Sequence, residues 1–233
     1  MLTPSLPALL TFVLLVLLVS LAWIAAMSRL SRRLGVLGAV VLAVWLAFTA
    51  TLAHRGLLHA MGAFPPPAMR LVLSGVLAVM GIGLSPLGKR LANETPLAWL
   101  VGFQAFRLPL EIVLWQLHQD GALPVQMTYA GQNFDVLSGV FALVLAIAIA
   151  RGRVARGWLW AWNLVSLGLL INIVQISIRS MPGPMRTFQN EPANTLIFGV
   201  PWIWLPTILV LSALAGHVLV ARRLLTDRQS HAG

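Results

Sequence analysis

Long apolar stretches separated by short polar connections make up most of this 233-residue chain. Several of them reach the ~20 residues that a helix needs to cross about 30 Å of hydrocarbon. The pattern predicts spans at about 6–27, 35–53, 69–87, 97–118, 134–150, 157–179 and 195–221. We therefore expect an all-α integral membrane protein, a seven-transmembrane-helix bundle in which residues 1–233 form a single polytopic domain and residues 222–233 form a short cytoplasmic tail.

Lysine and arginine are unequally divided between the connections. Eleven of them follow the first, third, fifth and seventh spans, and four follow the second, fourth and sixth. Because cytoplasmic loops carry the excess of basic residues, the N-terminus is expected outside and the C-terminus in the cytoplasm. The first apolar run lacks a preceding basic segment and is too long for a signal peptide, so it is expected to be a retained span.

Composition agrees with a membrane protein and excludes several kinds of site. Hydrophobic residues make up 59% of the chain and charged residues 9%. With no cysteine, the chain can form no disulfide, thiolate metal site, iron–sulfur cluster or covalently attached c-type haem. The net charge of +10 is explained by basic residues that flank the spans, so the expected partner is the lipid bilayer and no nucleic acid.

One face of the fourth span is polar. At 100° per residue, Gln104, Arg107, Glu111 and His118 fall on the same side of the helix. An arginine in hydrocarbon costs about 2.5–3.5 kcal/mol on insertion scales, so it needs a partner, and Glu111 has the i,i+4 spacing. Pro109 removes the hydrogen bond to the carbonyl of residue 105, which predicts a kink at this point.

The sixth span carries a second polar stripe, formed by Asn172, Gln175 and Arg179. The two stripes are expected to face each other across a cavity open to the outside. The alternative is an internal ion-pair network that only clamps the bundle. Asn163 points the other way and is expected to form an interhelical hydrogen bond.

Polar residues also precede the fifth and seventh spans, in GQNFD and NEPANT. Asn133 and Asn190 have the chemistry of N-caps, and Asp135 and Glu191 would lie in a first helical turn, where a negative charge is favourable. Capping alone explains these residue types. Since both helix ends would converge on the cavity mouth, Asn133, Asp135, Glu191 and Asn194 are also candidate mouth residues.

No cofactor is assigned from the sequence. Glu111 and His118 could support intramembrane acid–base chemistry, with or without a metal held by a loop histidine. Facing histidines could hold a b-type haem, but the histidines lie near the ends of the spans, and no spaced metal-ligand motif is present. We therefore expect no metal site, and place His217 at an interhelix contact or snorkelling toward the interface.

The chain resembles an uncharacterised family of small bacterial seven-helix inner-membrane proteins over roughly residues 100–220. The resemblance lies in the motifs QAFRLPLE, PVQMTYAGQNFD, AWNLVSLGLLINIV and FQNEPANTLIFGVPWIWLP. The resemblance implies a multi-pass protein of the bacterial cytoplasmic (inner) membrane. It implies no particular activity.

The leading hypothesis is a protein that binds or transports a small polar or anionic solute, or a lipid head group, in an outward-facing polar pocket. Two alternatives are a membrane-embedded enzyme that uses Glu111 and His118, and an accessory subunit clamped by its ion pairs. In the leading hypothesis, Arg107 or Arg179 pairs with an anionic group. The candidate pocket residues are Gln104, Arg107, Glu111, His118, Asn133, Asp135, Asn172, Gln175, Arg179, Glu191 and Asn194.

Overall fold

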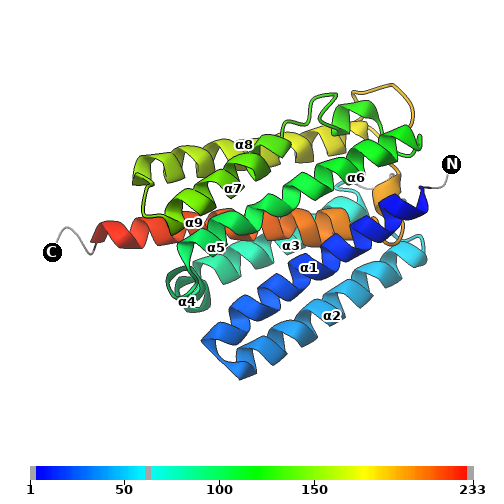
Figure 1. The fold of residues 1–233 in the computed structure, drawn as a ribbon. Coiled ribbons are helices and arrows are strands. Elements are labelled where there is room, and N and C mark those ends of the chain that lie inside the picture. The colour runs from blue at the N-terminus through cyan, green and yellow to red at the C-terminus, as the bar shows by residue number, and fades with distance from the viewer. Residues whose placement is uncertain (1–3, 61–63, 230–233) are drawn as a thin grey trace.

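The computed structural model describes residues 4–60 and 64–229, and within those ranges the protein is helical, without strands (Figure 1). The α-helices are α1 (Leu6–Leu30), α2 (Arg32–His54), α3 (Pro67–Leu84), α4 (Pro86–Glu94), α5 (Leu97–Gly102), α6 (Arg107–Gln119), α7 (Val136–Ala150), α8 (Arg156–Ser180) and α9 (Leu211–Gln229). Short 3₁₀ turns cover Phe103–Phe106, Val125–Met127 and Leu196–Phe198, and a π-helical segment covers Leu205–Val210.

Six helical segments of the described ranges are long and apolar enough to cross a membrane: Leu6–Leu30, Arg32–His54, Pro67–Leu84, Leu97–Gln119, Arg156–Ser180 and Leu205–Thr226. The remaining expected span corresponds to α7, an apolar helix of 15 residues. Large apolar side chains stay exposed along these helices, such as Leu14 on α1, Val44 on α2 and Leu77 on α3. An apolar surface of this kind is favourable in contact with lipid and would promote aggregation in water.

The helices run roughly along one axis, and the two termini lie at opposite ends of the bundle (Figure 1). α1 and α2 form a hairpin on one side, and α7 and α8 lie on the other. Between them α9 contacts α3, α4, α5 and α8. Because α9 touches so many neighbours, its side chains contribute to the centre of the protein, and this is where the polar residues meet.

Prolines set several helix boundaries. α3 ends at Leu84, short of the expected residue 87, because Pro86 begins the separate helix α4 with Ser85 as its N-cap. The last span begins as continuous helix at Leu205, ten residues later than expected, after a segment that contains Pro201. α9 continues to Gln229 through most of the expected tail, and residues 230–233 lie outside the described part.

The expected irregularity in the fourth span is present. α5 and α6 are joined by the 3₁₀ turn Phe103–Phe106, which ends immediately before Arg107. Pro109 has no N–H for the carbonyl of Ala105, and the N–H of Arg107 lies against that carbonyl instead. The turn brings Arg107 to the start of α6, with its side chain buried in the bundle.

Candidate functional site

The connection between α6 and α7 returns into the protein interior. α7 is about 22 Å long at 1.5 Å per residue, too short to cross the hydrocarbon alone, and its first turn meets the middle of the α5–α6 span. Residues 126–128 and Asn133 of the connection are buried. Its main chain is internally bonded, since the N–H groups of Gly131 and Asn133 both donate to the carbonyl of Thr128. Irregular backbone at this depth is tolerated where protein covers it.

Arg107 is held by three groups and is 1% exposed. Its Nη1 pairs with Asp135 Oδ1 at 2.8 Å and lies 3.4 Å from the carbonyl oxygen of Ser166. Its Nη2 lies 3.0 Å from His217 Nε2. Since a guanidinium only donates, His217 accepts at Nε2 and donates from Nδ1 to Asn163 Oδ1, 2.8 Å away. Four elements therefore meet at one cation.

The expected i,i+4 partnership between Arg107 and Glu111 is wrong as an ion pair. The carboxylate that contacts Arg107 is Asp135, which comes from α7's N-terminal end. Glu111 Oε1 instead accepts a hydrogen bond from Asn133 Nδ2 at 2.6 Å. Helical spacing relates only residues of one helix, whereas the returning loop brings a second acid to the arginine.

Asn133 connects the two carboxylates. Its Nδ2 donates to Glu111 and to the carbonyl of Met127, and its Oδ1 accepts from the N–H of Asp135 at 3.1 Å. The expected N-cap is wrong, because Asp135 and not Asn133 is the N-cap of α7, and Asn133 instead bonds the main chain of the turn that precedes it. Asp135 Oδ1 also accepts from the Ser138 hydroxyl at 3.0 Å. We call Arg107, Glu111 and Asp135 the charged cluster.

The charged cluster contains one cation and two carboxylates, all buried. Within the described part of the chain, Glu111 Oε2 and Arg107 Nε have no hydrogen-bond partner. A buried polar atom without a partner costs about 1–3 kcal/mol, and an uncompensated buried charge costs more. The protein therefore keeps one hydrogen-bond acceptor, on Glu111, and one donor, on Arg107, without a partner among the described residues.

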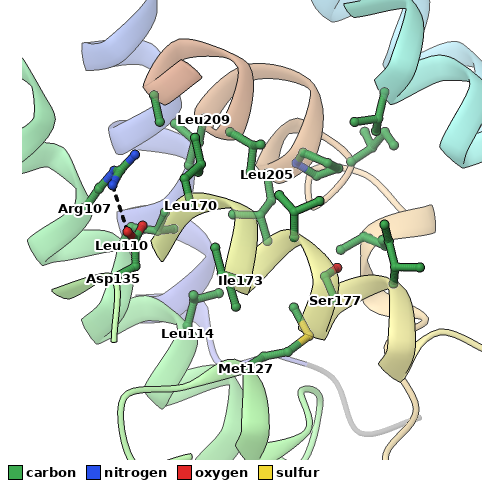
Figure 2. A pocket seen from close by; sticks show the side chains of 18 of the residues that line it. Arg107, Leu110, Leu114, Met127, Asp135, Leu170, Ile173, Ser177, Leu205 and Leu209 are labelled. Atoms are coloured by element: carbon green, nitrogen blue, oxygen red, sulfur yellow. Dashed lines mark hydrogen bonds and ion pairs between the residues drawn. The ribbon is translucent and has the colours of Figure 1, made fainter. Parts of the chain in front are cut away.

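A cavity of about 210 Å³ extends from the charged cluster between α3, α6, α8 and the start of the last span. Figure 2 shows Arg107 and Asp135 at one end and apolar side chains such as Leu170, Ile173 and Leu205 along the walls. Its polar lining residues are Arg107, Glu111, Asp135 and Ser177. The expected polar walls are therefore absent. The cavity is lined mainly by apolar side chains, and the charged cluster lies at one end of it.

The second polar stripe does not face the first. Gln175 and Arg179 are exposed and lie outside the cavity lining. Asn172 donates to the carbonyl of Gln132 at 2.9 Å and is not among the cavity residues. α8 presents mainly apolar side chains to the cavity, such as Leu170 and Ile173, whereas Arg179 near its end stays exposed, as a long arginine side chain at a helix end can.

Gln104 and His118 also lie outside the cavity. Gln104 is fully buried and donates from Nε2 to the carbonyl of Ala213 at 2.9 Å, against Gly216 of α9. His118 lies 3.0 Å from the carbonyl of Leu123 and packs beside Trp115. The structure therefore separates His118 from the charged cluster and gives no support to joint acid–base chemistry with Glu111.

The α8–α9 connection forms a network of its own. Exposed Glu191 pairs with Arg186 at 2.8 Å and accepts from the N–H of Ala193, and these contacts hold the pKa of Glu191 below its ordinary value. Buried Asn194 donates to the Ser177 hydroxyl at 2.9 Å. Neither residue caps the last span, because continuous helix begins only at Leu205. Of the two, only Asn194 adjoins a cavity residue, through Ser177.

Some residues of the network were not among the sequence candidates. His217 was expected at an interhelix contact or snorkelling toward the interface, and the interhelix contact is confirmed, since His217 is 1% exposed and touches Arg107. Asn163 forms the expected interhelical contact, with its side chain bonded to His217 of α9. A histidine in the middle of an apolar span is itself a signal of a polar interior. Within the described ranges, no group of three His, Cys, Asp or Glu residues could hold a metal ion.

A family model described as a domain of unknown function (DUF8737) matches residues 66–225. The matched region starts just before α3 and contains the whole charged cluster and cavity, whereas α1 and α2 precede it. No curated protein and no solved structure matches the chain. The match confirms an uncharacterised family, which is the coarser part of the resemblance seen in the sequence.

Proposed function

The chain belongs to the DUF8737 family, and from that premise we propose that its matched region binds, and in the membrane transports, a small lipid-like amphiphile. The observation that carries the proposal is the cavity that is apolar along its walls and charged at one end. A ligand that fits such a space has an apolar body and a polar end. This narrows the solute expected from the sequence to a molecule of the lipid type.

The position of the cavity supports a ligand that arrives from the bilayer. It is bordered by Met69 and Leu73 of α3 and by Ile173 and Val174 of α8, two helices that also expose large apolar residues such as Leu77 and Val165. An opening between lipid-facing helices admits molecules already dissolved in lipid. A purely structural clamp explains the Arg107–Asp135 pair, but it leaves the adjoining cavity without a role.

For topology we propose seven crossings, with the N-terminus outside and the C-terminus in the cytoplasm of a bacterial inner membrane. The distribution of basic residues supports this orientation, and the opposite positions of the two termini support an odd number of crossings (Figure 1). In this arrangement, α7 and the returning loop before it complete one crossing together. The cavity then lies in the outer half of the membrane.

Filling the cavity with a bulkier side chain tests the proposal. Val174 lines the cavity, whereas Ile171, three residues earlier on α8, is exposed and outside the lining. We expect native mass spectrometry of the purified protein to detect a retained amphiphile in the wild type and in Ile171→Trp, and to lose it in Val174→Trp. Both variants should melt near the wild-type temperature. Equal retention by Val174→Trp, or no retained or added amphiphile in any form, would contradict the proposal.

A further inference from the structure

Two of the side chains that line the cavity carry a buried polar atom without a partner among the described residues, Glu111 Oε2 and Arg107 Nε, and these atoms bear on which polar group the ligand carries. Both terminal nitrogens of Arg107 are occupied, by Asp135 and Ser166 at Nη1 and by His217 at Nη2. Glu111 has one oxygen on Asn133, and its second oxygen, Oε2, has no partner among the described residues. The arginine charge is thus already compensated, and the charge that remains available is a carboxylate.

The charges around Glu111 also leave its carboxylate without a compensating cation. Asp135 at the start of α7 and Arg107 at the start of α6 cancel each other. His217 of α9 is uncharged when it accepts from Arg107, and Ser166 and Ser177 of α8 carry no charge. On the packed elements, Arg70 of α3 and Arg179 of α8 are exposed, and neither is among the cavity residues. One carboxylate therefore remains uncompensated in a buried site, a state that costs several kcal/mol until a proton or a cation joins it.

We propose that the ligand is a cationic amphiphile, such as an amine or quaternary ammonium with an apolar tail, and that it exchanges with a proton on Glu111. This inference rests on the proposed function. In the empty site, the proton sits on the Glu111 carboxyl. When the ligand enters, the O–H bond breaks, the proton leaves to water, and the carboxylate pairs with the ligand's cationic group. One positive charge enters and one leaves, so the buried site stays neutral in both states.

An anionic head group fits less well. It could accept from Arg107 Nε, which has no partner among the described residues, but it would add a further negative charge beside Glu111 and Asp135. Like charges in a low-dielectric site repel strongly. A cation instead gains an ion pair with the Glu111 carboxylate while its tail lies against Leu170 and Leu209.

The test uses the full chain in phosphatidylcholine nanodiscs and three probes of equal tail length: decyltrimethylammonium, decyl sulfate and 1-decanol. Binding is measured by titration calorimetry against empty nanodiscs, in two buffers of different ionisation enthalpy so that released protons are counted. We expect decyltrimethylammonium to bind most tightly and to release about one proton per molecule bound. Glu111→Gln keeps the acceptor for Asn133 and should fold, yet it should weaken this binding about tenfold or more and release no proton.

The outcomes separate the two proposals. If no probe is sensitive to Val174→Trp, the cavity is not the binding site and both proposals fail. If decyl sulfate or decanol binds in the cavity as tightly as the cation, or if Glu111→Gln binds the cation like the wild type, the cationic ligand is refuted while the amphiphile site stands. Cation binding that depends on Glu111 but releases no proton refutes the exchange.

Discussion

Replacing Arg107 by glutamine should be far more damaging to stability than replacing Glu111 by glutamine. Arg107→Gln removes the 2.8 Å ion pair and leaves Asp135 and Glu111, two buried carboxylates, without a cation. Breaking a buried pair by removing one partner costs about 3–5 kcal/mol. The bond between Arg107 and His217 is lost as well, which leaves the histidine Nε2 without its donor.

Glu111→Gln acts in the opposite direction on the charge balance. Its remaining side-chain oxygen still accepts from Asn133, and the variant leaves Arg107 and Asp135 as a neutral pair. We expect its free energy of unfolding to lie within about 1 kcal/mol of the wild type or above it. The two variants should therefore differ by at least about 2 kcal/mol, although both replace an ionisable residue by glutamine on α6, one turn apart.

The assay is reversible unfolding in mixed micelles, followed by circular dichroism. Arg90→Gln is the control, because it removes an arginine from an exposed i,i+4 pair with Glu94, and should change the free energy of unfolding by less than about 1 kcal/mol. Equal losses in Arg107→Gln and Glu111→Gln would refute the reasoning, since they would show that Glu111 belongs to the structural pair.

Two further predictions concern other parts of the structure. A Cβ on Gly216 would lie 2.3 Å from Gln104 Nε2, so Gly216→Ala should displace that amide from Ala213 and cost about 1–3 kcal/mol in micelle unfolding, whereas Gly168→Ala, with open space around it, should cost nothing. Glu191→Gln should speed tryptic cleavage after Arg186 and leave cleavage after Arg153 unchanged. Because the pKa of Glu191 is lowered in the folded protein, the order it gives the loop is present at neutral pH and should fade as the pH falls through that lowered pKa, as exchange of the Ala193 amide would report.

The helices followed closely from the apolar pattern, because lipid imposes both length and composition on a span. The boundaries that differed lie at prolines and in the long α8–α9 connection, where local sequence allows more than one start. An irregularity near Pro109 was predictable, since its missing N–H is a property of one residue, but the prediction was a kink and the structure shows a 3₁₀ turn just before Arg107.

The partners of the polar residues were harder to predict. That Arg107 and Glu111 are buried followed from their position in an apolar span, but the pairing with Asp135 depends on a loop that folds back into the bundle. The orientation of α8 depends on packing against α7 and α9, which no pattern within that helix reveals. For His217 an interhelix contact was one of the two expected positions and is present, but its bond to Arg107 joins helices far apart in sequence, which no pattern within the last span reveals.

The most direct test of the central claim is infrared difference spectroscopy of the protein in nanodiscs, with and without decyltrimethylammonium. Glu111 is one of the residues that line the cavity, and its Oε2 lacks a partner among the described residues. We therefore predict that cation binding removes the carbonyl stretch of one protonated carboxylic acid and adds carboxylate bands, and that Glu111→Gln and Val174→Trp abolish this change. An unchanged carboxylic acid band in a wild-type protein that binds the cation would contradict the account.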